Sequence, residues 1–146
     1  AWAARSQFLE SIQAATDELD ECDVVVPRDK IAEYFNWVLT LQDKYKVTIR
    51  GFGHAGDGNL HIYACKEGDM SLDEFAEKAH DVMQEMYAKA VEMGGEISGE
   101  HGIGHSKVGF LEDAAGETKM ALMQGIKKVF DPNNILNPGK VCEKFD

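Results

Sequence analysis

The stretch that decides the fold covers residues 46–65 and reads KVTIRGFGHAGDGNLHIYAC. Apolar residues alternate with polar ones around Val47 and Ile49, and again from Leu60 to Cys65. Such alternation is typical of β-strands, because successive side chains point to opposite faces of a sheet. The pair Asp57-Gly58 between the two runs favours a tight reversal. The stretch therefore predicts an antiparallel hairpin.

Helical periodicity flanks this hairpin on both sides. Apolar residues at helical spacing predict four helices, over residues 6–19, from Pro27 to near Tyr45, from the Ser71 capping box to Gly94-Gly95, and over about 117–130. Short strands are expected at residues 24–26 and 96–98. Helices interspersed with short strands, of which two pair as a hairpin, predict an α+β fold with a mainly antiparallel sheet and helices packed on one face.

Length and composition predict one domain over residues 1–146. The chain is 44% hydrophobic and 28% charged, as expected for a globular protein, and no apolar run is long enough for a transmembrane segment. It has 15 Lys and Arg against 26 Asp and Glu, which gives a net charge of −11. Because this charge repels phosphate backbones and anionic membranes, we expect no nucleic-acid partner.

The cysteines indicate a reducing compartment. Cys22, Cys65 and Cys142 are odd in number, widely spaced and without a CxxC motif, which argues against a disulfide framework. The sequence shows no signal peptide and begins without an initiator methionine. We therefore expect a cytoplasmic localisation and a piece of a longer protein.

Two glycine-rich loops carry the residues that could bind a metal or take part in catalysis. His54 and His61 lie seven positions apart across the predicted turn, and the small residues between them allow the backbone to fold back. A second loop offers Glu100 and His101 at adjacent positions, whose side chains usually diverge. Two imidazoles and one carboxylate form a known donor set for a divalent metal. Two ordinary strand-end histidines are the alternative interpretation.

Three motifs, taken in order, resemble the C-terminal region of FAD-linked oxidases of the vanillyl-alcohol-oxidase type. The branch most similar contains D-lactate, glycolate and D-2-hydroxyglutarate dehydrogenases. The motifs are GHAGDGNLH at residues 53–61, GEHGIG at 99–104, and Asp131-Pro132 followed by NPGK at 137–140. The resemblance covers nearly the whole chain. It implies that residues 1–146 form a C-terminal substrate or cap domain and that an FAD-binding domain lies N-terminal to this segment.

The resemblance also implies site residues and partners. The metal, which is zinc, manganese or iron, would be bound by His54, His61 and Glu100. His101 would be the active-site base, Arg5 would meet the substrate carboxylate, and Asn137 would approach the FAD. The implied partners are a small 2-hydroxy acid and an electron acceptor, such as an electron-transfer protein or an Fe–S subunit.

The implied activity is metal-assisted oxidation of a 2-hydroxy acid to a 2-oxo acid, with hydride transfer to flavin. The chain alone would be inactive, because no side chain accepts a hydride. Some relatives place a basic residue where this chain has Glu21-Cys22, and this departure favours a short monocarboxylate such as lactate or glycolate. Two alternatives stay open: a self-contained metal-dependent hydrolase and a non-catalytic binding module.

Overall fold

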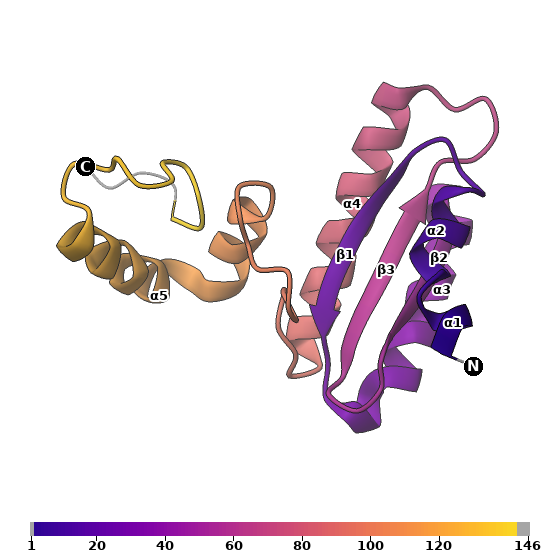
Figure 1. The fold of residues 1–146 in the computed structure, drawn as a ribbon, viewed down its shortest axis with the longest axis horizontal. Helices are drawn as coiled ribbons and strands as arrows, with labels where there is room; N and C mark the ends of the chain where they lie inside the picture. Colours follow the sequence, from indigo (N-terminus) through magenta and orange to yellow (C-terminus); the bar gives the residue numbers. More distant parts are fainter. Residues whose placement is uncertain (1, 143–146) are drawn as a thin grey trace. The chain divides into compact units, whose positions relative to one another are not determined.

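The computed structural model of the chain describes residues 2–142. These residues form two compact units, one that ends at Glu100 and one that begins at His101. Figure 1 shows the helices and strands of each unit. None of the described helices combines the length and the apolar character that crossing a bilayer requires.

A three-stranded antiparallel sheet forms the centre of the first unit. Its strands are β1 (Leu19–Val25), β2 (Thr48–His54) and β3 (Asn59–Cys65), in the spatial order β1-β3-β2 (Figure 1). The predicted hairpin is confirmed as β2 and β3. Every residue of β3 is buried, because this strand lies between the other two and has both faces covered.

The hairpin turn depends on one glycine. The backbone N–H groups of Asp57 and Gly58 both donate to the carbonyl of His54, which closes the turn. Gly58 has a φ of 89°, a conformation that L side chains rarely adopt. A Cβ at this position would also lie 2.1 Å from the Val26 carbonyl oxygen. Position 58 therefore requires glycine.

Two long helices cover one face of the sheet, α3 (Ile31–Tyr45) and α4 (Leu72–Glu92). The Tyr34 hydroxyl donates to the Met86 carbonyl at 2.8 Å and so joins the two helices. The covered face carries Cys22 and Ile62, both fully buried. This arrangement confirms the α+β class, and both helices end within two residues of where the sequence predicts.

The opposite face of the sheet is partly covered by the N-terminal segment, which contains α1 (Trp2–Arg5) and α2 (Phe8–Gln13). Ile12 packs there against Tyr63 and Cys65. The predicted helix over residues 6–19 is wrong in its second half. Leu19 instead begins β1 and pairs with Cys65, because long-range pairing with β3 outweighs the local helical spacing.

Two further predictions need correction. Residues 96–98 do not form a strand, and only Glu96 makes an isolated bridge, with Val25. In the second unit α5 (Val108–Phe130) begins well before residue 117. Gly116, with a φ of 72° and a ψ of 166°, interrupts α5, so the predicted helix corresponds to its second half.

Candidate metal and catalytic site

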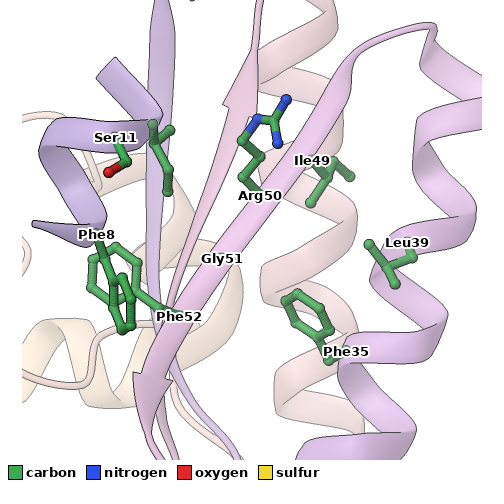
Figure 2. Close-up of a pocket in the computed structure, with 9 residues that line it drawn as sticks. Phe8, Ser11, Phe35, Leu39, Ile49, Arg50, Gly51 and Phe52 are labelled. Carbon is green, nitrogen blue, oxygen red and sulfur yellow. The ribbon is translucent and has the colours of Figure 1, made fainter. Parts of the chain in front are cut away.

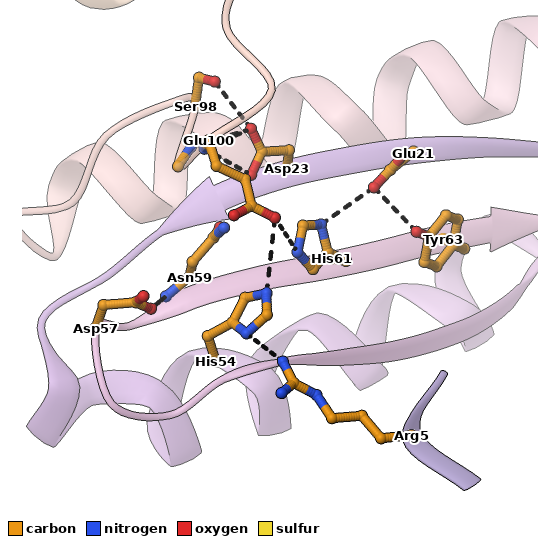
Figure 3. Close-up of polar contacts among 11 residues, drawn as sticks. Arg5, Glu21, Asp23, His54, Asp57, Asn59, His61, Tyr63, Ser98 and Glu100 are labelled. Carbon is orange, nitrogen blue, oxygen red and sulfur yellow. Dashed lines mark hydrogen bonds and ion pairs between the residues drawn. The ribbon is translucent and has the colours of Figure 1, made fainter. Parts of the chain in front are cut away.

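Strand pairing brings His54 and His61 together. His54 is the last residue of β2 and pairs with Asn59, and His61 follows two residues along β3. Residues two apart on a strand point to the same face, and antiparallel partners share a face, so both imidazoles point to one side. Their ring centroids lie 5.4 Å apart with the planes nearly perpendicular, at 85° (Figure 3).

Glu100 completes a cluster with these two histidines. Its Oε1 lies 3.0 Å from His61 Nε2 and 3.6 Å from His54 Nε2. One donor atom from each of the three side chains lies within 4.8 Å of the others. Ligands at about 2.1 Å from a tetrahedral metal are separated by roughly 3.4 Å. The structure thus brings together the three predicted ligands at spacings that suit one ion.

The other ring nitrogen of His61, Nδ1, faces the carboxylate of Glu21. His61 Nδ1 lies 3.2 Å from Glu21 Oε1, which also accepts a hydrogen bond from the Tyr63 hydroxyl at 2.9 Å. A carboxylate only accepts, so a neutral ring that donates from Nδ1 to Glu21 directs the lone pair of Nε2 at Glu100, whereas a protonated ring donates to both carboxylates. Two acceptors 3.0 Å apart repel each other unless a proton or a metal ion lies between them.

The Tyr63 hydroxyl stays a donor in this arrangement. Burial raises the pKa of Tyr63 well above its ordinary value, and the hydrogen bond to Glu21 raises it further. Tyr63 and the nearly buried His61 therefore both direct protons at one carboxylate oxygen. The contact holds the His61 ring in a single orientation.

The sequence predicts neither Asp23 nor Tyr63 as a site residue, and for Glu21 it predicts an effect on substrate choice but no contact with His61. The predicted strand began only at residue 24, so the two acidic residues were not placed on a sheet face. Their spacing of two, combined with pairing to β3, is the signal that places them beside His61. Glu21 contacts the His61 ring, and Asp23 binds the loop that carries Glu100.

Arg5 reaches the cluster from the end of α1. Its Nη2 donates to His54 Nδ1 at 2.7 Å, on the side of the ring away from Glu100 (Figure 3). The Arg5 side chain is exposed. The residue predicted to meet the substrate carboxylate therefore lies beside a predicted metal ligand.

His101 and Asn137 belong to the second unit. His101 is exposed in the loop that precedes α5. Asn137 is also exposed, has a φ of 50°, and lines an apolar hollow with Met123, Ile126 and Leu136. Their roles as base and as flavin contact stay predictions.

A separate hollow in the first unit lies along β2 (Figure 2). Phe8 and Phe52 line it on one side of the strand, and Phe35 and Leu39 line it on the other. Arg50 is its only charged lining residue, so the hollow offers no set of metal donors.

Comparison with known proteins assigns the class. Residues 1–141 match the family described as FAD linked oxidases, C-terminal domain. The chain belongs to this family, which confirms the resemblance that the three motifs predict.

The names of three relatives indicate which branch of this family the chain resembles. The chain is 54% identical over 145 residues to D-lactate dehydrogenase from Anaerostipes hadrus, which covers 99% of this chain and 30% of that protein. It is 42% identical over 122 residues to Glycolate oxidase subunit GlcD from Bacillus subtilis, at 84% and 26% coverage. It is 33% identical over 142 residues to D-2-hydroxyglutarate dehydrogenase from Stutzerimonas stutzeri, at 96% and 30% coverage. The chain spans less than a third of each relative's length.

Proposed function

We propose that this chain is the substrate-facing C-terminal part of an FAD-dependent enzyme that oxidises a short D-2-hydroxy acid to the 2-oxo acid. The FAD is bound mainly by a domain N-terminal to this segment. Membership of the family and the names of the relatives support the reaction class. The cluster of His54, His61 and Glu100 supports a divalent metal, which is zinc, manganese or iron.

The observation that carries the metal proposal is the approach of two imidazole nitrogens to one carboxylate oxygen: Glu100 Oε1 lies 3.0 Å from His61 Nε2 and 3.6 Å from His54 Nε2. A divalent cation held by His54, His61 and Glu100 would be bound by two neutral imidazoles and one carboxylate, a donor set that suits such ions. The carboxylates of Glu21 and Asp23 lie behind the cluster and add negative charge that favours a cation. Two imidazoles and one carboxylate leave coordination positions open for a substrate.

Each side chain has a role that follows from its chemistry. Arg5 binds the substrate carboxylate through its planar guanidinium, and His101 accepts the proton of the substrate hydroxyl. Asn137 approaches the flavin. A metal bound by the cluster would supply Lewis acidity that lowers the pKa of the hydroxyl. FAD supplies the hydride acceptor, and an electron-transfer protein or Fe–S subunit serves as the next acceptor.

Glu21 favours a short substrate. Its carboxylate lies 3.2 Å from the His61 ring, and its side chain is 29% exposed. Glu21 therefore presents negative charge at the edge of the cluster of His54, His61 and Glu100. A second carboxylate on the substrate would be repelled there. Lactate and glycolate, which lack this group, therefore fit better than 2-hydroxyglutarate.

The test is anaerobic reduction of the flavin in the full-length protein by D-lactate. We expect the flavin absorbance to bleach, the chelator-treated protein to bleach at least about tenfold more slowly, and added Zn²⁺ or Mn²⁺ to restore the rate. His54→Ala should behave like the chelated protein, and His80→Ala, an exposed change on α4, should behave like the wild type. Full activity without metal would refute the metal site, and no bleaching by any 2-hydroxy acid would refute the reaction.

A further inference from the structure

We infer that Asp23 is a positioning residue: its buried carboxylate holds the backbone of residues 98–100 so that the Glu100 side chain faces His61. This inference deepens the proposed function and rests on it for the identity of the metal ligands. Asp23 binds the backbone of residues 98–100. It acts through the loop that carries Glu100.

The contacts of Asp23 come from three consecutive residues (Figure 3). Its Oδ2 accepts from Ser98 Oγ at 2.8 Å and from the backbone N–H of Gly99 at 3.1 Å. The backbone N–H of Glu100 donates to the same oxygen at 3.2 Å and to Oδ1 at 3.3 Å. One carboxylate thus accepts from the N–H groups of two consecutive peptides, Ser98–Gly99 and Gly99–Glu100.

Burial makes these hydrogen bonds strong. Asp23 has an exposed fraction of 0%, and a buried carboxylate is costly unless donors surround it. Hydrogen bonds to a charged acceptor contribute more than those between neutral groups. The loop lies outside any helix or strand, so the Asp23 contacts replace the backbone bonds that such an element would provide.

The strand register places Asp23 next to the cluster of His54, His61 and Glu100. Asp23 on β1 is the direct partner of His61 on β3, so the anchor and the ligand lie side by side on one sheet face. The Glu100 side chain is 52% exposed, and packing therefore contributes little to its placement. The distance between Glu100 Oε1 and His61 Nε2 depends instead on where Asp23 fixes the Glu100 backbone.

Gly99 allows the loop to lie this close to β3. A Cβ at this position would lie 2.0 Å from Asn59 Oδ1, and Asn59 is only 4% exposed. A side chain at residue 99 would therefore push the loop away from the Asp23 carboxylate. The close approach is a condition for the contacts that hold Glu100.

The test is Zn²⁺ affinity by chelator competition for Asp23→Asn in the intact chain. Asparagine keeps the size of the side chain and loses one acceptor oxygen, so we expect affinity to fall about 10- to 100-fold. Asp20→Asn removes the same charge from an exposed position of β1 and should change affinity less than about twofold. In a Glu100→Ala background Asp23→Asn should not lower the Zn²⁺ affinity further, because Asp23 acts on the metal only by positioning Glu100. An equal loss in both backgrounds would overturn the inference.

Amide hydrogen exchange tests the anchor without metal. In Asp23→Asn the amides of Gly99 and Glu100 should exchange at least about tenfold faster, whereas core amides of α3 and α4 should be unchanged. Ser98→Ala removes one donor and should give a smaller acceleration, so it serves if Asp23→Asn does not fold. Unchanged exchange at both amides would refute the anchor. Failure of the wild type to bind Zn²⁺ would refute the proposed metal site, and the exchange data would then decide on the anchor alone.

Discussion

Arg5 donates a hydrogen bond from Nη2 to Nδ1 of His54 over 2.7 Å. A guanidinium has no acceptor, so Nδ1 presents a lone pair and the neutral His54 ring carries its proton on Nε2. A metal bound through Nε2 requires the opposite tautomer. The Arg5 contact and metal ligation by His54 Nε2 therefore exclude each other, and binding of the metal should release Arg5 toward the substrate carboxylate.

Arg5→Ala should separate these two roles. We expect Zn²⁺ to bind about three- to tenfold more tightly, because a competing hydrogen bond and a positive charge are removed. Binding of D-lactate to the metal-loaded protein should weaken. Zn²⁺ titration and lactate titration measure the two effects, with the exposed Arg28→Ala as the control. A loss of metal as large as in His54→Ala would contradict the conclusion that the Arg5 contact and metal binding by His54 exclude each other.

Removal of the proposed base and removal of a proposed metal ligand should affect turnover and metal content differently. His101→Ala should lower turnover of the full-length enzyme by about 10² to 10⁴ and retain the metal, because a general base acts beside the ion without binding it. His54→Ala and His61→Ala should lose both metal and turnover. Metal analysis combined with steady-state kinetics distinguishes the two patterns. Loss of metal from His101→Ala, with flavin retained, would show that His101 is a ligand.

Glu21→Gln should broaden the substrate range. The amide oxygen of glutamine still accepts a hydrogen bond from His61 or Tyr63, and the negative charge is gone. We expect the ratio of kcat/KM for D-2-hydroxyglutarate to kcat/KM for D-lactate to rise by about tenfold. Asp20→Asn is the charge-matched control on the same strand. An unchanged ratio would mean that Glu21 does not face the distal end of the substrate.

Asp131 should make the C-terminal segment sensitive to acid. The hydrogen bond from Lys127 holds the pKa of Asp131 below its ordinary value, and the N–H groups of Ile135 and Leu136 lower it further. A lowered folded pKa contributes stability above the unfolded value, near 4, that is lost as pH falls through the folded pKa. The amide chemical shifts of Ile135 and Leu136 should therefore stay native down to about pH 4 and move below it. In Asp131→Asn they should be displaced already at pH 7, and native shifts there would contradict this role.

The three cysteines should resist alkylation in the folded chain. All three are buried, and burial raises the pKa of the Cys65 and Cys142 thiols. Iodoacetamide at pH 8 should label the native chain at least about tenfold more slowly than the chain in denaturant, as counted by mass spectrometry. Rapid labelling of Cys22, which is fully buried, would contradict the packing of α3 and α4 on the sheet.

Local sequence patterns were sufficient to predict the hairpin and the long helices. Alternation in residues 46–65 and the Asp57-Gly58 turn act over short distances, and the structure has β2 and β3 there. The capping box likewise marks the start of α4, where the Ser71 side chain accepts from the backbone N–H of Glu74. These signals reside in neighbouring residues, so a sequence reports them directly.

The first strand shows where local patterns fail. Residues 19–23 contain three acidic side chains, so the sequence predicts a helix that ends at Leu19, an interruption at residues 21–23 and a strand that begins only at Val24. Pairing with β3, about forty residues away in the chain, makes them β1. Such pairing depends on surfaces that only the folded chain presents.

The sequence by itself therefore determined the types of donor, two imidazoles and a carboxylate on glycine-rich loops, and the turn that places the histidines at one end of a hairpin. Only the tertiary structure decided that Glu100 faces His61, that Glu21 contacts His61 Nδ1, and that Arg5 binds His54. The physical reason is that these contacts join residues 39 to 49 positions apart in the chain. Their distances follow from the register of the sheet and from the buried Asp23, and neither is expressed in any short stretch of the chain.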